Sequence, residues 1–141
     1  MINFLEMRNP SKTKSIALMG IMYLIAALIG YLTFKLTRSE MPELLALFLA
    51  DVVATVIVWG FGLLYKNVSV YDPYWSVAPP VMFTAFGVYK SVFTLPVGLL
   101  LVAVWYWGIR LTGNWAYTFK GLAYEDWRYT RYRKTQSPGV F

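Results

Sequence analysis

The sequence contains no cysteine and no histidine, and only 14% of its 141 residues are charged. The absence of cysteine excludes disulfide frameworks and thiol nucleophiles. The absence of histidine excludes haem ligation by histidine, the usual zinc sites and the histidine general base of hydrolase triads. Disulfide-stabilised folds, the usual zinc proteins and histidine-dependent hydrolases are therefore excluded before any motif is considered.

Apolar residues are abundant instead, with 58% hydrophobic and 18% aromatic side chains. A typical soluble domain is about 25% charged and at most about half apolar. A soluble fold of this size buries only about two-thirds of its surface, so it has no room for this much apolar material. Together with long apolar runs, this predicts an all-α polytopic membrane protein.

Four segments are candidate membrane spans: Ile16–Phe34, Leu44–Leu64, Tyr74–Tyr89 and Ser91–Ile109. A spanning helix needs about 20 apolar residues. The third segment is shorter and contains Pro79-Pro80, so it is predicted to be a short, broken span. Gly20 and Gly30 in the first segment are expected to permit close contact with a neighbouring helix.

The cations are distributed unevenly about these spans. With four spans, one side of the membrane carries nine of them, namely Arg8, Lys12, Lys14, Lys66, Lys120, Arg128, Arg131, Arg133 and Lys134, and the other carries Lys35, Arg38 and Lys90. The positive-inside rule then predicts that both termini are cytoplasmic. The organisation is a cytoplasmic segment 1–14, a membrane domain 15–121 and a basic, aromatic juxtamembrane tail 122–141. Because topology accounts for the net charge of +6, nucleic acid is not an expected partner.

Asp51 interrupts the second span. An ionisable group at this depth costs a few kcal/mol, so it normally faces a partner or a wet cavity. Thr55 and Trp59 follow at four-residue steps on the same helix face. Asp51 is either a proton, cation or substrate site, or a structural hydrogen bond to a neighbouring helix.

The segment Asn67–Ser76 (NVSVYDPYWS) is the most unusual stretch. Pro73 disfavours helical geometry at Asp72, so this carboxyl group is expected at a helix break beside the membrane. Tyr71, Tyr74 and Trp75 would limit its hydration, which favours a role as proton donor. The alternative is an interfacial turn with aromatic belt residues.

A polar stripe is expected on the last span and its extension. Its members follow steps of three and four residues, and they are Trp107, Arg110, Asn114, Tyr117 and Gly121. A guanidinium group there suits a phosphate or a carboxylate. The alternative is that the arginine extends to the lipid headgroups and the asparagine faces water.

The tail Tyr124–Lys134 combines acids, cations and aromatic residues. Such a segment is expected to contact anionic lipid headgroups, to pair internally or to bind a phosphorylated ligand. No glycine-rich nucleotide-binding motif accompanies it. Membrane lipids are therefore expected partners.

Several motifs occur together in order: LADVVAT at 49–55, KNVSVYDPYWSVAPP at 66–80, WGIRL at 107–111, Asn114-Trp115 and EDWRY at 125–129. In these motifs the chain resembles an uncharacterised family of bacterial membrane proteins. That family is related to the steroid 5-alpha-reductases and, more remotely, to the isoprenylcysteine methyltransferases.

The resemblance implies an NADPH-dependent reduction of an enone double bond in a lipid-like substrate, such as a steroid or an isoprenoid, in the bacterial inner membrane. Such proteins have about twice this length and roughly seven spans. The chain then corresponds to their N-terminal half. It would need the C-terminal half, or another membrane chain, to complete the cofactor site, and no turnover is expected from it alone.

Individual roles follow from the same resemblance. Asp72 corresponds to the carboxylic acid next to the substrate. Trp107 stands where better-known relatives have a tyrosine, so Tyr71 or Tyr74 would supply the phenolic donor. Arg110 and Arg128 stand where the relatives have arginines that contact the cofactor, and Asn114 is predicted to join them. The predicted substrate contacts are Trp75, Trp107 and Asp51.

Two other functions remain open from the residues alone. A small four-helix transporter would use Asp51 as its proton site. A non-catalytic membrane subunit would require neither Asp51 nor Asp72.

Overall fold

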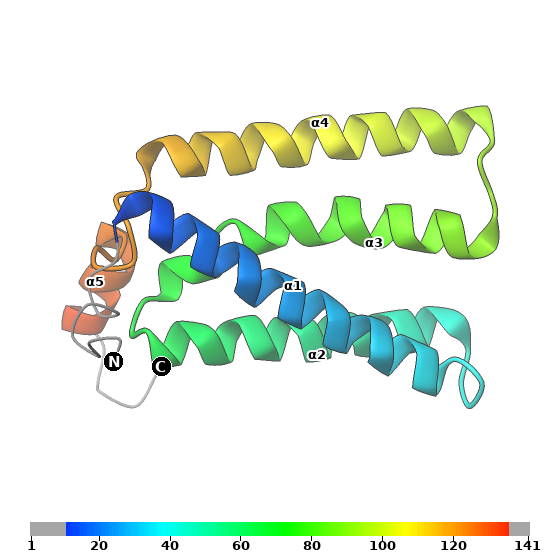
Figure 1. The fold of residues 1–141 in the computed structure, drawn as a ribbon, viewed down its shortest axis with the longest axis horizontal. Coiled ribbons are helices and arrows are strands. Elements are labelled where there is room, and N and C mark those ends of the chain that lie inside the picture. The colour runs from blue at the N-terminus through cyan, green and yellow to red at the C-terminus, as the bar shows by residue number, and fades with distance from the viewer. Residues whose placement is uncertain (1–10, 136–141) are drawn as a thin grey trace. The chain divides into compact units, whose positions relative to one another are not determined.

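The computed structural model describes residues 11–135, and every regular element in that range is helical (Figure 1). The elements are α1 (Lys12–Thr37), α2 (Glu43–Leu64), the 3₁₀ turn η2 (Val68–Val70), α3 (Tyr74–Lys90), α4 (Leu95–Thr118) and α5 (Trp127–Thr135). They form two compact units. Unit 1 comprises residues 1–71 and 120–141, and unit 2 comprises residues 72–119. The predicted all-α class is confirmed.

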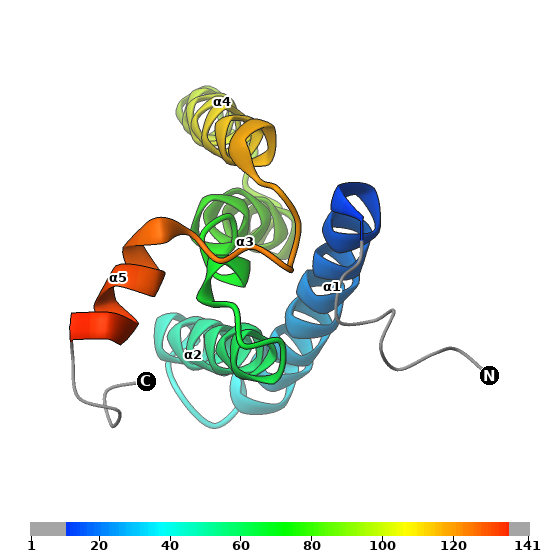
Figure 2. The ribbon, with the colours of Figure 1, turned by 90° about the vertical axis from the view of Figure 1, so that its left-hand side faces the viewer.

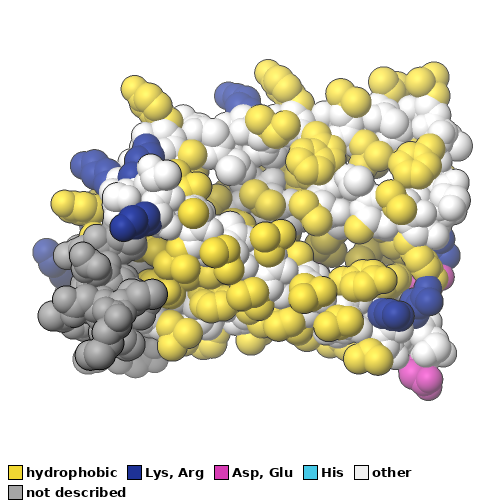
Figure 3. Space-filling model, in the orientation of Figure 1, with side chains coloured by type: hydrophobic (Ala, Val, Ile, Leu, Met, Phe, Trp, Pro, Cys, Tyr) yellow, Lys and Arg dark blue, Asp and Glu magenta, His cyan; other side chains and the backbone are white. Residues whose placement is uncertain are grey.

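Three helices are long and apolar enough to cross a bilayer, namely α1, α2 and α4. With 26, 22 and 24 residues, they extend about 39, 33 and 36 Å at about 1.5 Å per residue, which exceeds the roughly 30 Å of hydrocarbon. Hydrophobic side chains run along α1 and α2, and Lys and Arg side chains lie near the helix ends (Figure 3). The chain is an integral membrane protein.

The fourth expected span, α3, is a helix of 17 residues and about 25 Å. The predicted break at Pro79-Pro80 is wrong, because α3 continues through both prolines. The prolines remove the N–H groups that would bond to the carbonyls of Trp75 and Ser76. Gly108 of α4 lies so close to the Ser76 carbonyl that a Cβ there would be 2.5 Å from that oxygen. Packing in unit 2 thus supports the helix where its own ladder is interrupted.

In unit 1, small residues form the contact between α1 and α2. The buried residues of α2 recur at every fourth position: Ala46, Ala50, Ala54, Val58 and Gly62. Gly30 of α1 faces them, and a Cβ added to it would lie 3.2 Å from the Ala50 oxygen. Stripes of small residues allow helices to pack closely, which matters in a membrane because no hydrophobic effect drives helices together there. The expected role of Gly30 is confirmed, whereas Gly20 has no neighbour within 4 Å of an added Cβ.

Shortly after the end of both α2 and α3, a residue other than glycine adopts the left-handed backbone conformation. Lys66 has φ 52° and Ser91 has φ 53°. The following amides reach back to close the helix ends, Asn67 N–H to Gly62 O at 2.9 Å and Val92 N–H to Gly87 O at 3.1 Å. This is the Schellman arrangement, and it aims the chain sharply into the next segment.

The boundaries of α4 also differ from those predicted. Residues 91–94 lie outside the helix, which begins at Leu95 and continues nine residues past Ile109 to Thr118. Gly121 therefore lies outside the predicted polar stripe. It has φ 114°, a conformation that glycine adopts at little cost, in the turn after α4. The predicted tail 122–141 contains α5, and residues 136–141 lie outside the described range, as do residues 1–10 of the N-terminal segment.

Candidate functional site

Asp72 lies in the turn between η2 and α3, at the helix break that the sequence predicts. It is half-buried, and Pro73 caps α3 directly after it. The Pro73 carbonyl accepts hydrogen bonds from the Val77 N–H at 3.1 Å and the Ser76 hydroxyl at 3.0 Å. Asp72 therefore precedes the first turn of α3, where the helix dipole favours a carboxylate. Tyr74, two residues after Asp72, is buried.

Two tryptophans predicted as substrate contacts meet in unit 2. The rings of Trp75 and Trp107 lie 6.0 Å apart between centroids and are tilted by 59°. Trp75 is 50% exposed and Trp107 is 38% exposed, so the pair presents aromatic surface rather than filling a core. This surface begins at Trp75, in the first turn of α3 and three residues after Asp72.

Hydrogen bonds that involve side-chain hydroxyl groups also join α3 to α4. Ser76 and Thr112 share a hydrogen bond of 2.9 Å between their hydroxyls. Further along, the Trp105 indole N–H donates to the Thr84 hydroxyl at 2.9 Å. These bonds, with the close approach at Gly108, fix the position of Trp107 relative to Trp75.

Arg110, Asn114 and Tyr117 lie on a different side of α4. With about 3.6 residues per turn, they point away from the Gly108 side that packs on α3. All three are exposed, and Tyr117 is 86% exposed. The predicted stripe thus exists from Arg110 to Tyr117, and its guanidinium and amide groups are accessible.

Unit 1 contains a buried polar network that sequence reasoning did not identify. Asn67 is 1% exposed, and its amide donates to the carbonyls of Leu122 at 2.8 Å and Tyr124 at 3.3 Å. Its side-chain oxygen accepts the Ser69 N–H at 3.0 Å. One side chain therefore ties η2 to the segment after α4.

Further bonds reinforce the same junction. The Glu125 carboxylate accepts the Val68 N–H at 3.0 Å, and the Ser69 hydroxyl accepts the Asp126 N–H at 2.9 Å. From α1, the buried Ser15 hydroxyl accepts the Leu122 N–H at 3.1 Å, and the Tyr23 hydroxyl donates to Val70 O at 2.6 Å. As a result residues 122–126, which lead into α5, lie at the end of unit 1 where α1 begins and α2 ends. Figure 2 faces that end and shows α5 and the start of α1 on opposite sides of it.

Tyr71 and Arg128, two other predicted site residues, belong to unit 1. Tyr71 is half-buried and ends η2, where its N–H donates to Val68 O at 2.9 Å. The Arg128 guanidinium donates through Nε to Asp126 Oδ1 at 2.8 Å and through Nη2 to Oδ2 at 3.1 Å. Arg128 is therefore engaged by a carboxylate within its own unit.

This pairing has an electrostatic consequence. The hydrogen bond from Arg128 holds the pKa of Asp126 below its ordinary value of 3.8, against the smaller opposing effect of partial burial. A lowered folded-state pKa means that the pair stabilises the fold above pH 3.8, and that this contribution is lost as the pH falls through the lowered pKa.

We therefore expect the start of α5 to loosen only in strongly acidic solution. Amide hydrogen exchange is measured at pH 6 and at pH 2.5, on either side of the ordinary pKa of 3.8. It should reveal faster opening of residues 128–130 at the lower pH. An Asp126→Asn variant should lack this acid transition. A transition that persists unchanged in the variant would contradict the assignment.

Asp51 lies in α2, away from the groups just described. It is half-buried, with Thr55 also half-buried and Trp59 exposed one and two turns on. Within the described residues, Asp51 makes no hydrogen bond and no ion pair. The structure therefore does not provide the interhelical hydrogen bond that would make Asp51 a structural residue.

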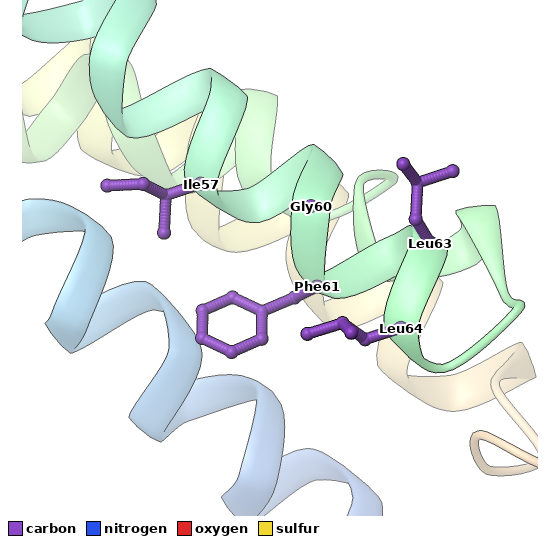
Figure 4. Close-up of a pocket in the computed structure, with 5 residues that line it drawn as sticks. All are labelled: Ile57, Gly60, Phe61, Leu63 and Leu64. Carbon is purple, nitrogen blue, oxygen red and sulfur yellow. The ribbon is translucent and has the colours of Figure 1, made fainter.

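A shallow depression lies near the end of α2 (Figure 4). It is lined by Ile57, Gly60, Phe61, Leu63 and Leu64. All five are apolar, so the depression offers neither a proton donor nor a polar contact. Ile57 and Phe61 point from α2 toward α1 (Figure 4), so the depression is an apolar hollow beside these two helices.

The Asn67 network escaped sequence reasoning because its partners are 55 and 57 residues away. The available signal was a pair of small polar residues, Asn67 and Ser69, within an otherwise apolar and aromatic segment. That signal shows that the polar groups need partners. It does not say which partners these are.

Residues 58–139 match the profile of a family described as "Protein of unknown function (DUF1295)". The match includes every predicted site residue except Asp51. No match was found among curated proteins or among solved structures.

Proposed function

Because the chain belongs to the DUF1295 family, we propose that it forms the N-terminal part of an integral membrane reductase. The proposed reaction is the NADPH-dependent reduction of an enone double bond in a lipid-like substrate, such as a steroid or an isoprenoid. We place it in the bacterial inner membrane because of its family resemblance. Both termini are proposed to be cytoplasmic, because nine of its cations fall on that side when α3 crosses the bilayer together with α1, α2 and α4.

The half-buried carboxyl group of Asp72, in a turn beside exposed aromatic rings, carries this proposal. An apolar substrate packed on Trp75 and Trp107 would exclude water from the start of α3. In that environment a protonated Asp72 can donate to the carbonyl oxygen of an enone as negative charge develops there. Since the α3 dipole favours the ionised carboxylate, the acid role depends on this exclusion of water. Of the two tyrosines predicted as phenolic donors, Tyr74 belongs to the same unit as Asp72 and would assist it.

Two of the three predicted cofactor contacts fit an anionic dinucleotide. Arg110 and Asn114 are exposed one helical turn apart on α4, and together they offer a guanidinium group for phosphate and an amide for a hydroxyl or a phosphate oxygen. Arg128 fits less well, because Nε and Nη2 are already bonded to Asp126. When bound, NADPH supplies the hydride for the carbon β to the carbonyl.

The decisive experiment compares Asp72→Asn with the unchanged sequence, each joined to the C-terminal half that completes the cofactor site, in membranes with NADPH and either a steroid enone or an isoprenoid enone. We expect kcat to fall by about 10²- to 10⁴-fold, the usual contribution of a positioned general acid, with helix content unchanged. Glu40→Gln, in the loop between α1 and α2, is the matched control and should retain full turnover. Normal turnover in Asp72→Asn would remove the role proposed for this residue.

One observation favours a second candidate function, a proton-coupled transporter. Asp51 lies near the middle of α2 without a hydrogen-bonding or ionic partner among residues 11–135, and unpaired acids at this depth often mark ion pathways. Proton-linked uptake into liposomes that disappears in Asp51→Asn would support transport. Enone reduction that survives in the same variant would separate the two functions.

A further inference from the structure

The end of unit 1 at which α1 begins and α2 ends is strongly basic. Its described cations are Lys12, Lys14, Lys66, Lys120, Arg128, Arg131 and Lys134. Among the described residues of this end, the acids are Glu125 and Asp126, and both are engaged, with the Val68 amide and with Arg128. The opposite end of α1 and α2 is balanced, with Lys35 and Arg38 against Glu40 and Glu43.

Helix α5 presents two cations and one aromatic ring on the same side. With about 3.6 residues per turn, Trp127, Arg131 and Lys134 share a face, and all three are exposed. Tyr132 is also exposed but projects from a different side of the helix, nearer to the half-buried Tyr129 than to this face. Trp127 is 68% exposed, an unusual position for a large aromatic ring in water and a usual one at the membrane interface.

The Asn67 network sets the depth of this face. It fixes residues 122–126 against η2, which directly follows the end of α2, and against Ser15 in the first turn of α1. Since α1 and α2 are long enough to cross the bilayer, α5 is held at the level where their apolar segments end. That level is the headgroup region of the membrane.

We propose that α5 lies in the headgroup region and binds anionic phospholipid, with Arg131 and Lys134 on lipid phosphates and with Trp127 at the interface. Lysine and arginine near an anionic leaflet are attracted to it, whereas a neutral leaflet offers no such attraction. The proposal does not depend on reductase activity. It uses none of the residues assigned to substrate or cofactor.

The absence of native cysteine provides a direct test. A spin label on Thr130→Cys, an exposed position beside the basic face of α5, reports depth through its relative accessibility to oxygen and to a water-soluble nickel complex. The protein is compared in nanodiscs of phosphatidylcholine alone and of phosphatidylcholine with phosphatidylglycerol. We expect deeper immersion with the anionic lipid, and we expect that 1 M salt, which shortens the screening length to about 3 Å, reverses it.

Charge reversal tests the residues themselves. Arg131→Glu combined with Lys134→Glu should abolish the dependence on anionic lipid, while Lys35→Glu at the balanced end should retain it. The labelled Thr130→Cys protein, with Arg131 and Lys134 unchanged, provides a further test through its response to salt, because its basic face is intact. Equal depth in both lipids, or displacement by inorganic phosphate or by RNA without a response to lipid charge, would overturn the proposal.

Discussion

Replacing Gly108 by alanine is expected to destabilise unit 2 by about 1–3 kcal/mol, the usual cost of overpacking. The added Cβ would lie 2.5 Å from the Ser76 carbonyl oxygen and 2.8 Å from Pro80 Cγ. One of these atoms belongs to the backbone and the other to a rigid ring, so neither can rotate away. Helices α3 and α4 must separate, which weakens the bonds of Ser76 to Thr112 and of Trp105 to Thr84.

Gly113→Ala is the matched control for this prediction. It lies on the same helix, and an added Cβ there has no neighbour within 4 Å. The control should be neutral or more stable by up to about 1 kcal/mol, because alanine favours helix over glycine. Unfolding in mixed micelles by titration with dodecyl sulfate measures both variants. Equal stability of the two would mean that α3 and α4 do not pack as closely as the structure has them.

Replacing Asn67 by alanine is expected to cost about 2–4 kcal/mol and to release the segment that positions α5. The substitution leaves the carbonyls of Leu122 and Tyr124 and the Ser69 N–H without the bonds that Asn67 provides. Leaving buried polar groups unsatisfied costs about 1–3 kcal/mol each, less where water can enter. Amide exchange of residues 122–126 should accelerate at least tenfold.

Two further variants separate the hydrogen bonds of Asn67 from its volume. Asn67→Asp keeps the shape but places a carboxylate against two carbonyl oxygens, so it should be at least as destabilising as alanine. Asn114→Ala, on the exposed side of α4, should change stability by no more than about 0.5 kcal/mol. Unchanged exchange at residues 122–126 in Asn67→Asp would show that the network does not hold this segment.

Sequence reasoning placed the candidate site in part. It predicted the helix break at Asp72, because proline restricts the residue that precedes it, and this effect is local. It also placed Arg110, Asn114 and Tyr117 on one helix face from their spacing alone. It did not foresee that Trp75 and Trp107 meet or that Arg128 bonds to Asp126, since these contacts depend on packing and on the choice among several possible partners.

The lengths of the apolar runs by themselves determined that the chain is helical and spans a membrane, because hydrocarbon requires every backbone polar group to be satisfied within its own segment. The tertiary structure alone decided that α3 continues through two prolines, that Gly108 must lack a side chain and that residues 122–126, which lead into α5, are fixed against η2 and Ser15. Each of these features rests on atoms far apart in the sequence. A local pattern states which group needs a partner, and only the packed chain supplies it.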